Sequence, residues 1–248
     1  MALEGEATPR SEFLEGAALS APIIIGVAPF GALFGMIAVQ NGFSVWEAVF
    51  MSATIYGGAS QLVGVDMFGT NVAPWLIVLS IFAVNFRHVL YSASVGRYFA
   101  RWPLLQQAIA YFLLVDPTFA ESERRIIVDR RPPSFVWYMG MAIPIYVLWL
   151  VATWVGAVFG PLIPNAHAIG LDFILPIYFF CMVLEFRARA NWLPIAAASA
   201  LGSSIAFHTI GSPWHISIGA IAGVLVGAFL LGGRDNGPAD IDTTGAGL

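Results

Sequence analysis

The feature that most constrains this chain is a succession of eight long apolar segments with little polar sequence between them. They cover residues 17–39, 45–65, 72–95, 103–120, 134–159, 169–186, 191–207 and 213–232. About 20 apolar residues suffice for a helix to cross the hydrocarbon core of a bilayer. Only 10% of the residues are charged, whereas a soluble domain carries about 25%. The sequence therefore predicts an all-α, polytopic integral membrane helical bundle with seven or eight spans.

Polar sequence is concentrated at the two ends of the chain. Residues 1–15 form an acidic tail without the pattern of a cleavable signal, and residues 233–248 are rich in Gly, Asp and Thr. We expect one transmembrane transporter domain over residues 16–232, with a disordered C-terminal tail after it.

Two topologies remain open, and they differ in the short fourth segment. If all eight segments span the membrane, a cytoplasmic N-terminus leaves only Arg97 and Arg101 outside. If residues 103–120 are re-entrant, an external N-terminus leaves only Arg10 outside. Both satisfy the positive-inside rule almost equally well, and both place the 121–134 loop inside.

The first segment is dense in residues that interrupt helices. Proline removes an intrahelical hydrogen bond, and the freed carbonyl must find a partner in a neighbouring helix or a cavity. We predict a broken helix here that lines a cavity. The residues concerned are Pro22, Gly26, Pro29, Gly31 and Gly35. Gly31 and Gly35 also form a GxxxG motif, as do Gly219, Gly223 and Gly227, and such stripes predict close helix packing.

The stretch "IYGGASQLVG" in the second segment has two interpretations. The first is a packing stripe in which Ser60 bonds to its own backbone. The second is an unwound backbone that offers N–H and C=O groups to a zwitterion, because two consecutive glycines are costly inside a helix. The second interpretation makes this stretch a candidate substrate-binding site, consisting of Gly57, Gly58, Ala59, Ser60 and Gln61.

The third segment carries Asn85, Arg87 and His88 within four positions. A charged side chain at the centre of a membrane helix costs about 2.5–3.5 kcal/mol and usually faces a cavity. Arginine is suited to bind a carboxylate, so Asn85 and Arg87 are candidate substrate ligands. His88 titrates near neutral pH and is a candidate for proton coupling. Helical spacing places these residues on two stripes, Asn85–His88–Ser92 and Arg87–Tyr91–Ser94.

Asp116 follows a short apolar run and precedes Pro117. It has two interpretations, as the stop of a helix or as the counter-ion of Arg87. The second makes Asp116 another candidate for proton coupling.

Four stretches in this order give the chain a resemblance to a known family. They are "FGALFGMIAVQNGFSVWEA", "SATIYGGASQ", "VNFRHVLYSAS" and "DPTFA". Together they resemble the AzlC (YgaZ-type) family, over about residues 15–125. The resemblance implies the large subunit of a bacterial exporter of branched-chain amino acids in the inner membrane, completed by a small hydrophobic AzlD-type subunit. The chain departs from its relatives at Pro117, where they typically carry Glu.

The leading functional hypothesis is secondary-active export of small apolar L-amino acids, coupled to the proton motive force. The chain contains no lysine and no G-x-x-x-x-G-K-[ST] motif that would bind ATP phosphates. We expect no enzymatic activity, no cofactor, no metal and no nucleic-acid partner. The alternatives are an intramembrane serine protease that uses Ser60 and His208, and a passive channel or assembly subunit.

An internal repeat would support a transporter. Segments one to three and six to eight both begin with a proline-bearing helix, which a tryptophan-led one follows (Pro22 then Trp46, Pro176 then Trp192). This pattern is compatible with an inverted repeat.

Overall fold

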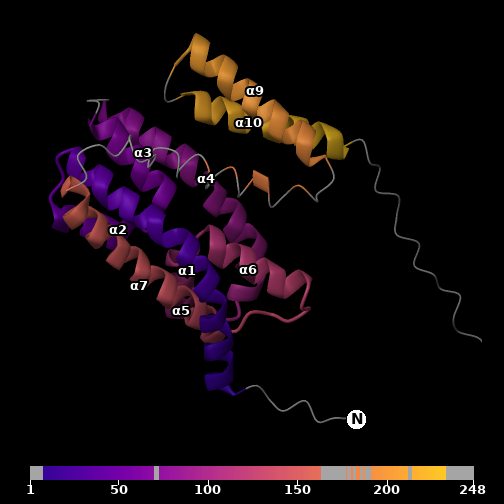
Figure 1. Ribbon diagram of the computed structural model, residues 1–248. Coiled ribbons are helices and arrows are strands. Elements are labelled where there is room, and N and C mark those ends of the chain that lie inside the picture. The colour runs from indigo at the N-terminus through magenta and orange to yellow at the C-terminus, as the bar shows by residue number, and fades with distance from the viewer. Residues whose placement is uncertain are drawn as a thin grey trace, which may run out of the picture. The chain divides into compact units, whose positions relative to one another are not determined.

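The computed structural model describes residues 8–69, 73–162, 191–211 and 214–232, and the single positions 177, 180, 183, 184 and 187. These residues are helical apart from short connections (Figure 1). The chain divides into two compact units, residues 1–178 and 179–248, and each is described by itself. Most of the sixth predicted segment, 169–186, and the tail 233–248 lie outside the described residues.

Helix α1 (Pro9–Gln40) runs without interruption through Pro22 and Pro29. The prediction of a broken first helix is therefore wrong. Thr8 caps the helix, and its side chain accepts a hydrogen bond from the Ser11 backbone N–H. The first two turns of α1 lie within the stretch expected to be a polar tail. The helix stays straight enough to pack along its length on one partner, helix α7.

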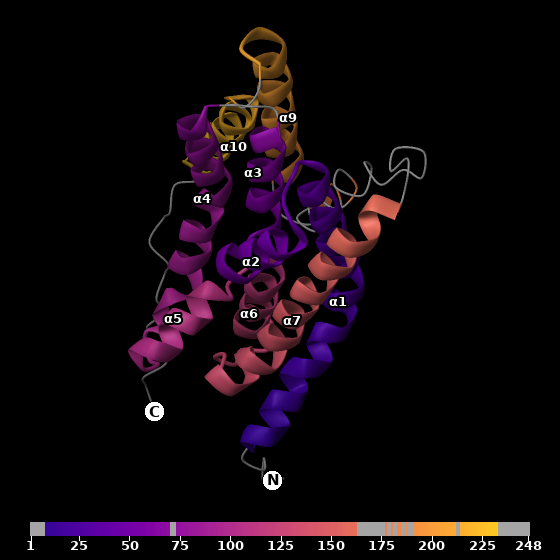
Figure 2. The ribbon, with the colours of Figure 1, turned by 90° about the vertical axis from the view of Figure 1, so that its left-hand side faces the viewer.

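Helices α1 and α7 (Phe135–Phe159) are held together by glycines. A methyl group on Gly16 would overlap the carbonyl of Trp137, and one on Gly35 would overlap the carbonyl of Thr153. Gly156 of α7 faces the Ala32 carbonyl in the same way. The Gly16 contact lies near the start of both helices, and the Gly35 and Gly156 contacts lie near the end of both. Helices α1 and α7 therefore run parallel (Figures 1 and 2). The predicted packing role of the Gly31–Gly35 motif is confirmed, because small residues let helix backbones approach closely.

The second predicted segment is a helical hairpin, not one span. Helix α2 (Val45–Ile55) and helix α3 (Gly58–Gly69) are separated by an unwound turn. Gly69 lies against Asn41, and the rings of Phe43 and Phe68 are 5.1 Å apart. The hairpin therefore enters and leaves beside the C-terminal end of α1. Hydropathy cannot separate a hairpin from a span, because both are apolar over about 20 residues.

A second hairpin enters from the opposite end of the unit. Helix α4 (Pro74–Phe99) follows α3 and ends with the Phe99 ring 5.2 Å from Tyr138, near the start of α7. Helices α5 (Leu104–Phe112) and α6 (Asp116–Ile127) then form the hairpin. Arg125, near the end of α6, forms an ion pair with Glu15 of α1 at 2.6 Å. The fourth predicted segment thus returns to the end of the unit from which it came.

Three described helices are long and apolar enough to cross a membrane, namely α1, α4 and α7. A hairpin lies between each consecutive pair, so the first unit has fewer long helices than predicted segments, and the count of seven or eight spans stays a prediction. The N-terminus of α1 and the C-terminus of α4 lie at the same end, which we call the arginine end. It carries all arginines of the first unit except Arg87. They are Arg10, Arg97, Arg101, Arg124, Arg125, Arg130 and Arg131. The positive-inside rule predicts that this end faces the cytoplasm.

The second unit contains helices α9 (Trp192–Thr209) and α10 (Trp214–Gly232), which pack as a hairpin. A methyl group on Gly219 would lie 2.9 Å from the Ser199 carbonyl oxygen, and one on Gly202 would lie 2.8 Å from Cβ of Ala222. The predicted packing role of the glycine stripe in α10 is confirmed at Gly219 and Gly223, both of which face Ser199. The predicted repeat of the sixth to eighth segments includes residues outside the described part and stays a prediction.

We expect Gly35→Ala to lower the thermal unfolding midpoint in detergent by several degrees, because its methyl group meets the α7 backbone. Overpacking of this kind costs about 1–3 kcal/mol. Gly26→Ala on the same helix is the matched control, since nothing lies within 4 Å of the added carbon. Equal midpoints for the two variants would contradict the proposed seam.

The arrangement predicts opposite labelling of single cysteines at the two ends of the first unit, in a Cys181→Ser background. A membrane-impermeant maleimide should label Leu162→Cys in intact cells, because the C-terminal end of α7 faces outward. Arg101→Cys and Arg131→Cys should react only after permeabilisation. Labelling of Arg101→Cys but not Arg131→Cys from outside would restore the eight-span topology.

Candidate functional site

The tips of the two hairpins meet near the middle of α4 and α7. Tyr56, at the first tip, adopts a left-handed backbone conformation with φ 41° and ψ 54°. Its ring lies 6.1 Å from that of Phe112, beside the second tip, and 4.9 Å from that of Tyr146 on α7. The Tyr146 hydroxyl donates to the Ala53 carbonyl at 2.9 Å. Aromatic contacts therefore join both hairpins to α7 at one level.

The unwound turn predicted at the two glycines is present at Tyr56 and Gly57. The Ser60 hydroxyl donates to the Gly57 carbonyl at 2.8 Å, and the Gln61 backbone N–H donates to the same oxygen. The structural part of both interpretations is present, because the backbone is unwound and Ser60 bonds to its own backbone; the role of this stretch in substrate binding stays a prediction. The buried Ser60 hydroxyl thus donates to its own backbone, and the protease alternative stays a prediction.

Gly58 and Ala59 serve the packing of the tip. A methyl group on Gly58 would lie 2.8 Å from Cη2 of Trp149 and 3.0 Å from the ring of Phe30. Ala59 is buried with them. These rings provide an apolar wall beside the first tip.

A buried polar network that the sequence did not reveal fixes the two arms of the first hairpin to α7. Oγ of Ser52 accepts from Nε2 of Gln61 at 3.1 Å and from Nε1 of Trp149 at 3.2 Å. It is also 2.9 Å from the hydroxyl of Thr153. Ser52, Gln61 and Thr153 are each 0% exposed. Oε1 of Gln61 has no hydrogen-bond partner, so this amide has an unused acceptor inside the protein.

Helix α4 presents its polar residues to both hairpins. Asn85 faces the first tip, because its Oδ1 lies 3.9 Å from the position of a methyl group on Gly57. This oxygen is buried and has no hydrogen-bond partner. His88 is half-buried, with its ring 5.7 Å from that of Tyr91. The predicted Asn85 stripe thus meets the first hairpin.

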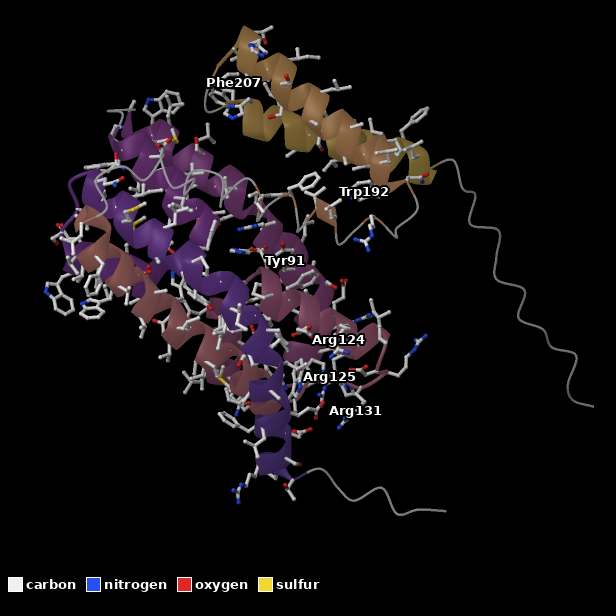
Figure 3. The ribbon with its side chains drawn as sticks, in the orientation of Figure 1. Tyr91, Arg124, Arg125, Arg131, Trp192 and Phe207 are labelled. Atoms are coloured by element: carbon white, nitrogen blue, oxygen red, sulfur yellow. The ribbon has the colours of Figure 1, made fainter. Side chains whose placement is uncertain are left out.

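The other stripe of α4 meets the second hairpin. Nη1 of Arg87 lies 3.0 Å from Oδ1 of Asp116, and the Tyr91 hydroxyl donates to the same oxygen at 2.7 Å. Tyr91 stacks on Phe119 at 4.1 Å, and Figure 3 labels it on α4. Asp116 is therefore the counter-ion of Arg87, as one of its two interpretations proposed. It begins helix α6 and does not end α5.

Tyr91 is a site residue whose role the sequence analysis missed. Helical spacing placed it on the same stripe as Arg87, but its hydrogen bond to Asp116 was not predicted. Further along the same stripe, the Ser94 hydroxyl donates to Glu123 of α6 at 3.5 Å. Nε of Arg87 is buried without a partner, so the guanidinium binds Asp116 through one nitrogen and keeps a further donor. Asp116 therefore does not use all the hydrogen-bond donors of Arg87.

Thr118 closes the second tip. Its fully buried hydroxyl accepts from the Val115 backbone N–H at 2.9 Å and donates to the Leu113 carbonyl at 2.9 Å. Helices α3 and α6 thus both begin in the middle of the unit. Their first-turn N–H groups carry the positive end of the helix dipole, which favours anionic groups.

At the arginine end, the buried side chain of Arg125 connects three helices. Arg125 is 2% exposed, pairs with Glu15 at 2.6 Å and Glu12 at 3.7 Å, and lies over the Trp137 ring at 4.4 Å. Arg124, Arg125 and Arg131 gather beside the N-terminal part of α1 (Figure 3). These contacts tie α1, α6 and α7 together at this end, away from the hairpin tips.

Among the described residues, no group of three or more His, Cys, Asp or Glu side chains is placed to hold a metal ion. The polar centre combines one ion pair, neutral amide oxygens and two helix N-termini. Such a set of groups suits a small molecule that carries both charges.

Comparison with known proteins places this architecture in context. The model of the AzlC protein family matches residues 22–163, which include helix α1 from Pro22 onward, both hairpins, α4 and α7. The inner membrane protein YgaZ of Escherichia coli (strain K12) is 33% identical over 219 residues, 87% of each chain.

More distant relatives carry only general names. An uncharacterized membrane protein of Archaeoglobus fulgidus is 28% identical over 220 residues, 89% of this chain and 94% of its own length. Another from Helicobacter pylori (strain ATCC 700392 / 26695) is 27% identical over 187 residues, 71% of this chain and 78% of its own length. No solved structure matches the chain.

We expect Asp116→Ala to lower the thermal unfolding midpoint, because it leaves the Arg87 charge without its partner. Breaking a fully buried pair costs about 3–5 kcal/mol; these side chains are 15–23% exposed, so about 1–3 kcal/mol is expected. Arg87→Ala together with Asp116→Ala should recover part of the loss. Arg124→Ala, which breaks exposed pairs, should change the midpoint little. Strictly additive single effects would contradict the coupling.

Proposed function

The chain belongs to the AzlC family, and from that premise we propose that it is a secondary-active transporter of small apolar L-amino acids. In this proposal it exports branched-chain amino acids across the bacterial inner membrane, in which it is a multi-pass protein. The observation that carries the proposal is the meeting of two helical hairpins, from opposite ends, around the polar centre of α4. Broken helices at the middle of a membrane domain are typical of transporter binding sites.

The groups at the tips suit the polar head of an amino acid. We propose that Arg87, which has a free buried donor, binds the substrate carboxylate. The unwound backbone at Gly57 and the adjacent Gln61 and Asn85 receive other polar atoms of the substrate. The rings of Phe30 and Trp149 offer an apolar wall for a branched side chain.

We propose that substrate transport is coupled to proton binding at the Arg87–Asp116 ion pair. A substrate carboxylate at Arg87 weakens the hold of Arg87 on Asp116, and the released carboxylate then binds a proton more readily. His88 is the second titratable group on this part of α4. A membrane potential of 100 mV supplies about 2.3 kcal/mol per charge moved, which corresponds to a gradient of roughly 50-fold.

A partner is proposed from the family premise. We infer that a small hydrophobic AzlD-type membrane subunit completes the transporter. Transport should therefore be measured with and without that subunit. A chain that supports no flux alone or with the subunit would be an assembly subunit or belong to another class.

The test is leucine flux in proteoliposomes that carry a proton gradient. We expect Arg87→Ala to abolish accumulation against the gradient, because the carboxylate loses its partner. His88→Ala should retain exchange but lose its dependence on the proton gradient. Arg97→Ala, whose residue lies at the arginine end, is the matched control and should transport normally. Near-normal uphill flux in both Arg87→Ala and His88→Ala would remove this mechanism.

A further inference from the structure

Gly57 differs from the other glycines that the structure describes in the first unit in what surrounds it. Beyond its chain neighbours, the three heavy atoms nearest to the position of an added methyl group are all oxygens. They are Oγ of Ser60 at 2.6 Å, the carbonyl oxygen of Ile55 at 3.8 Å and Oδ1 of Asn85 at 3.9 Å. At Gly58, one residue later, the nearest atoms are ring carbons. A ligand group beside Gly57 would therefore contact oxygens, whereas a side chain at residue 57 would displace Oγ of Ser60.

These oxygens present lone pairs, not protons. The Ser60 hydroxyl proton is directed to the Gly57 carbonyl, so its oxygen faces the space as an acceptor. Ile55 is the last residue of α2, and a helix C-terminus carries partial negative charge. Oδ1 of Asn85 is buried without a donor.

A second unpaired acceptor belongs to the same hairpin. Gln61 is 0% exposed and its Oε1 has no partner. Leaving a buried acceptor without a donor destabilises the folded protein. The first hairpin and the side of α4 that faces Gly57 thus each carry a buried acceptor without a donor.

We propose that the space beside Gly57 is a binding site for a small monovalent cation. Its oxygens are neutral, which suits a single positive charge better than a divalent ion, since hard divalent cations are usually bound by carboxylates. The cation is either the ammonium group of the amino-acid substrate or a free sodium ion, because both bind neutral oxygens. The ammonium source rests on the proposed function, whereas the sodium source does not.

The site stands apart from the Arg87–Asp116 pair. Asn85 and Arg87 are two residues apart on α4, which places them on different faces of the helix. Asn85 meets the first hairpin, and Arg87 meets the second. The cation site is therefore a separate part of the polar centre. It binds a positively charged group, whereas Arg87 is proposed to bind a negatively charged one.

The experiment measures ligand binding to the purified full chain in nanodiscs. Binding of ²²Na⁺ is measured without amino acid, and leucine binding is measured in sodium and in choline buffers. Leucine is compared with 4-methylpentanoate, which keeps the carboxylate and the branched chain but lacks the ammonium group. Sodium binding without leucine identifies the free ion. Sodium-independent binding of leucine, but not of 4-methylpentanoate, identifies the ammonium group.

Two variants remove the site in different ways. Asn85→Leu removes an oxygen at nearly constant volume, and Gly57→Ala fills the space. Each should weaken binding of the identified cation by roughly tenfold or more, as expected for the loss of a charged hydrogen bond. Gly64→Ala on the same hairpin is the control, because its methyl group would meet only side-chain carbons of Ile81 and Met51.

The outcomes separate this inference from the proposed function. Wild-type affinity for leucine and sodium in both variants would overturn the cation site, as would equal binding of 4-methylpentanoate and leucine without sodium binding. Leucine transport would remain possible in either case. Sodium binding without any amino-acid binding or flux would support the site and overturn the proposed function. Binding of neither probe to the wild-type chain would overturn both.

Discussion

Along the seam between α1 and α7, carbonyl oxygens of one helix lie against the glycines of the other. Because no side chain separates the backbones at Gly16, Gly35 and Gly156, the two helices pack closely over most of their length. Apolar side chains gain little from leaving lipid for each other, so close backbone packing must hold membrane helices together. This parallel pair is the frame on which both hairpins rest. The first hairpin bonds to α7 through Ser52 and the second through Tyr138, whose hydroxyl donates to the Ala110 carbonyl.

Each hairpin tip interrupts a helix where water is scarce, and the freed backbone groups must be satisfied within the protein. Ser60 does this at the first tip and Thr118 does it at the second, each through a hydroxyl that bonds a turn carbonyl. The polar side chains of α4 lie between the tips. The cost of placing Arg87 in this apolar helix is offset by Asp116 and by the solvation that a polar centre provides. Structure and proposed chemistry therefore depend on the same few groups.

Sequence reasoning predicted correctly those features that depend on the backbone preference of a residue or on its position along the helical repeat. Two adjacent glycines predicted the unwound turn at Gly57, and three-to-four spacing predicted that Arg87 and Tyr91 share a stripe. Sequence reasoning did not predict features that depend on contacts with residues distant in the sequence. Pro22 and Pro29 do not break α1, because packing on α7 holds the helix on both sides of each proline. Ser52 gave no signal at all, since its partners Trp149 and Thr153 are about 100 residues away.

The sequence by itself determined that the chain is an apolar, all-helical membrane protein of the AzlC family with charged groups inside its third segment. Composition and periodicity suffice for the helical membrane class, because they report what each segment can be buried in, whereas the family follows from similarity of sequence motifs. Only the tertiary structure decided that the second and fourth segments turn back as hairpins. It also decided that Asp116 neutralises Arg87 and that Asn85 faces Gly57. These features arise from contacts between distant segments, and hydropathy measures each segment alone.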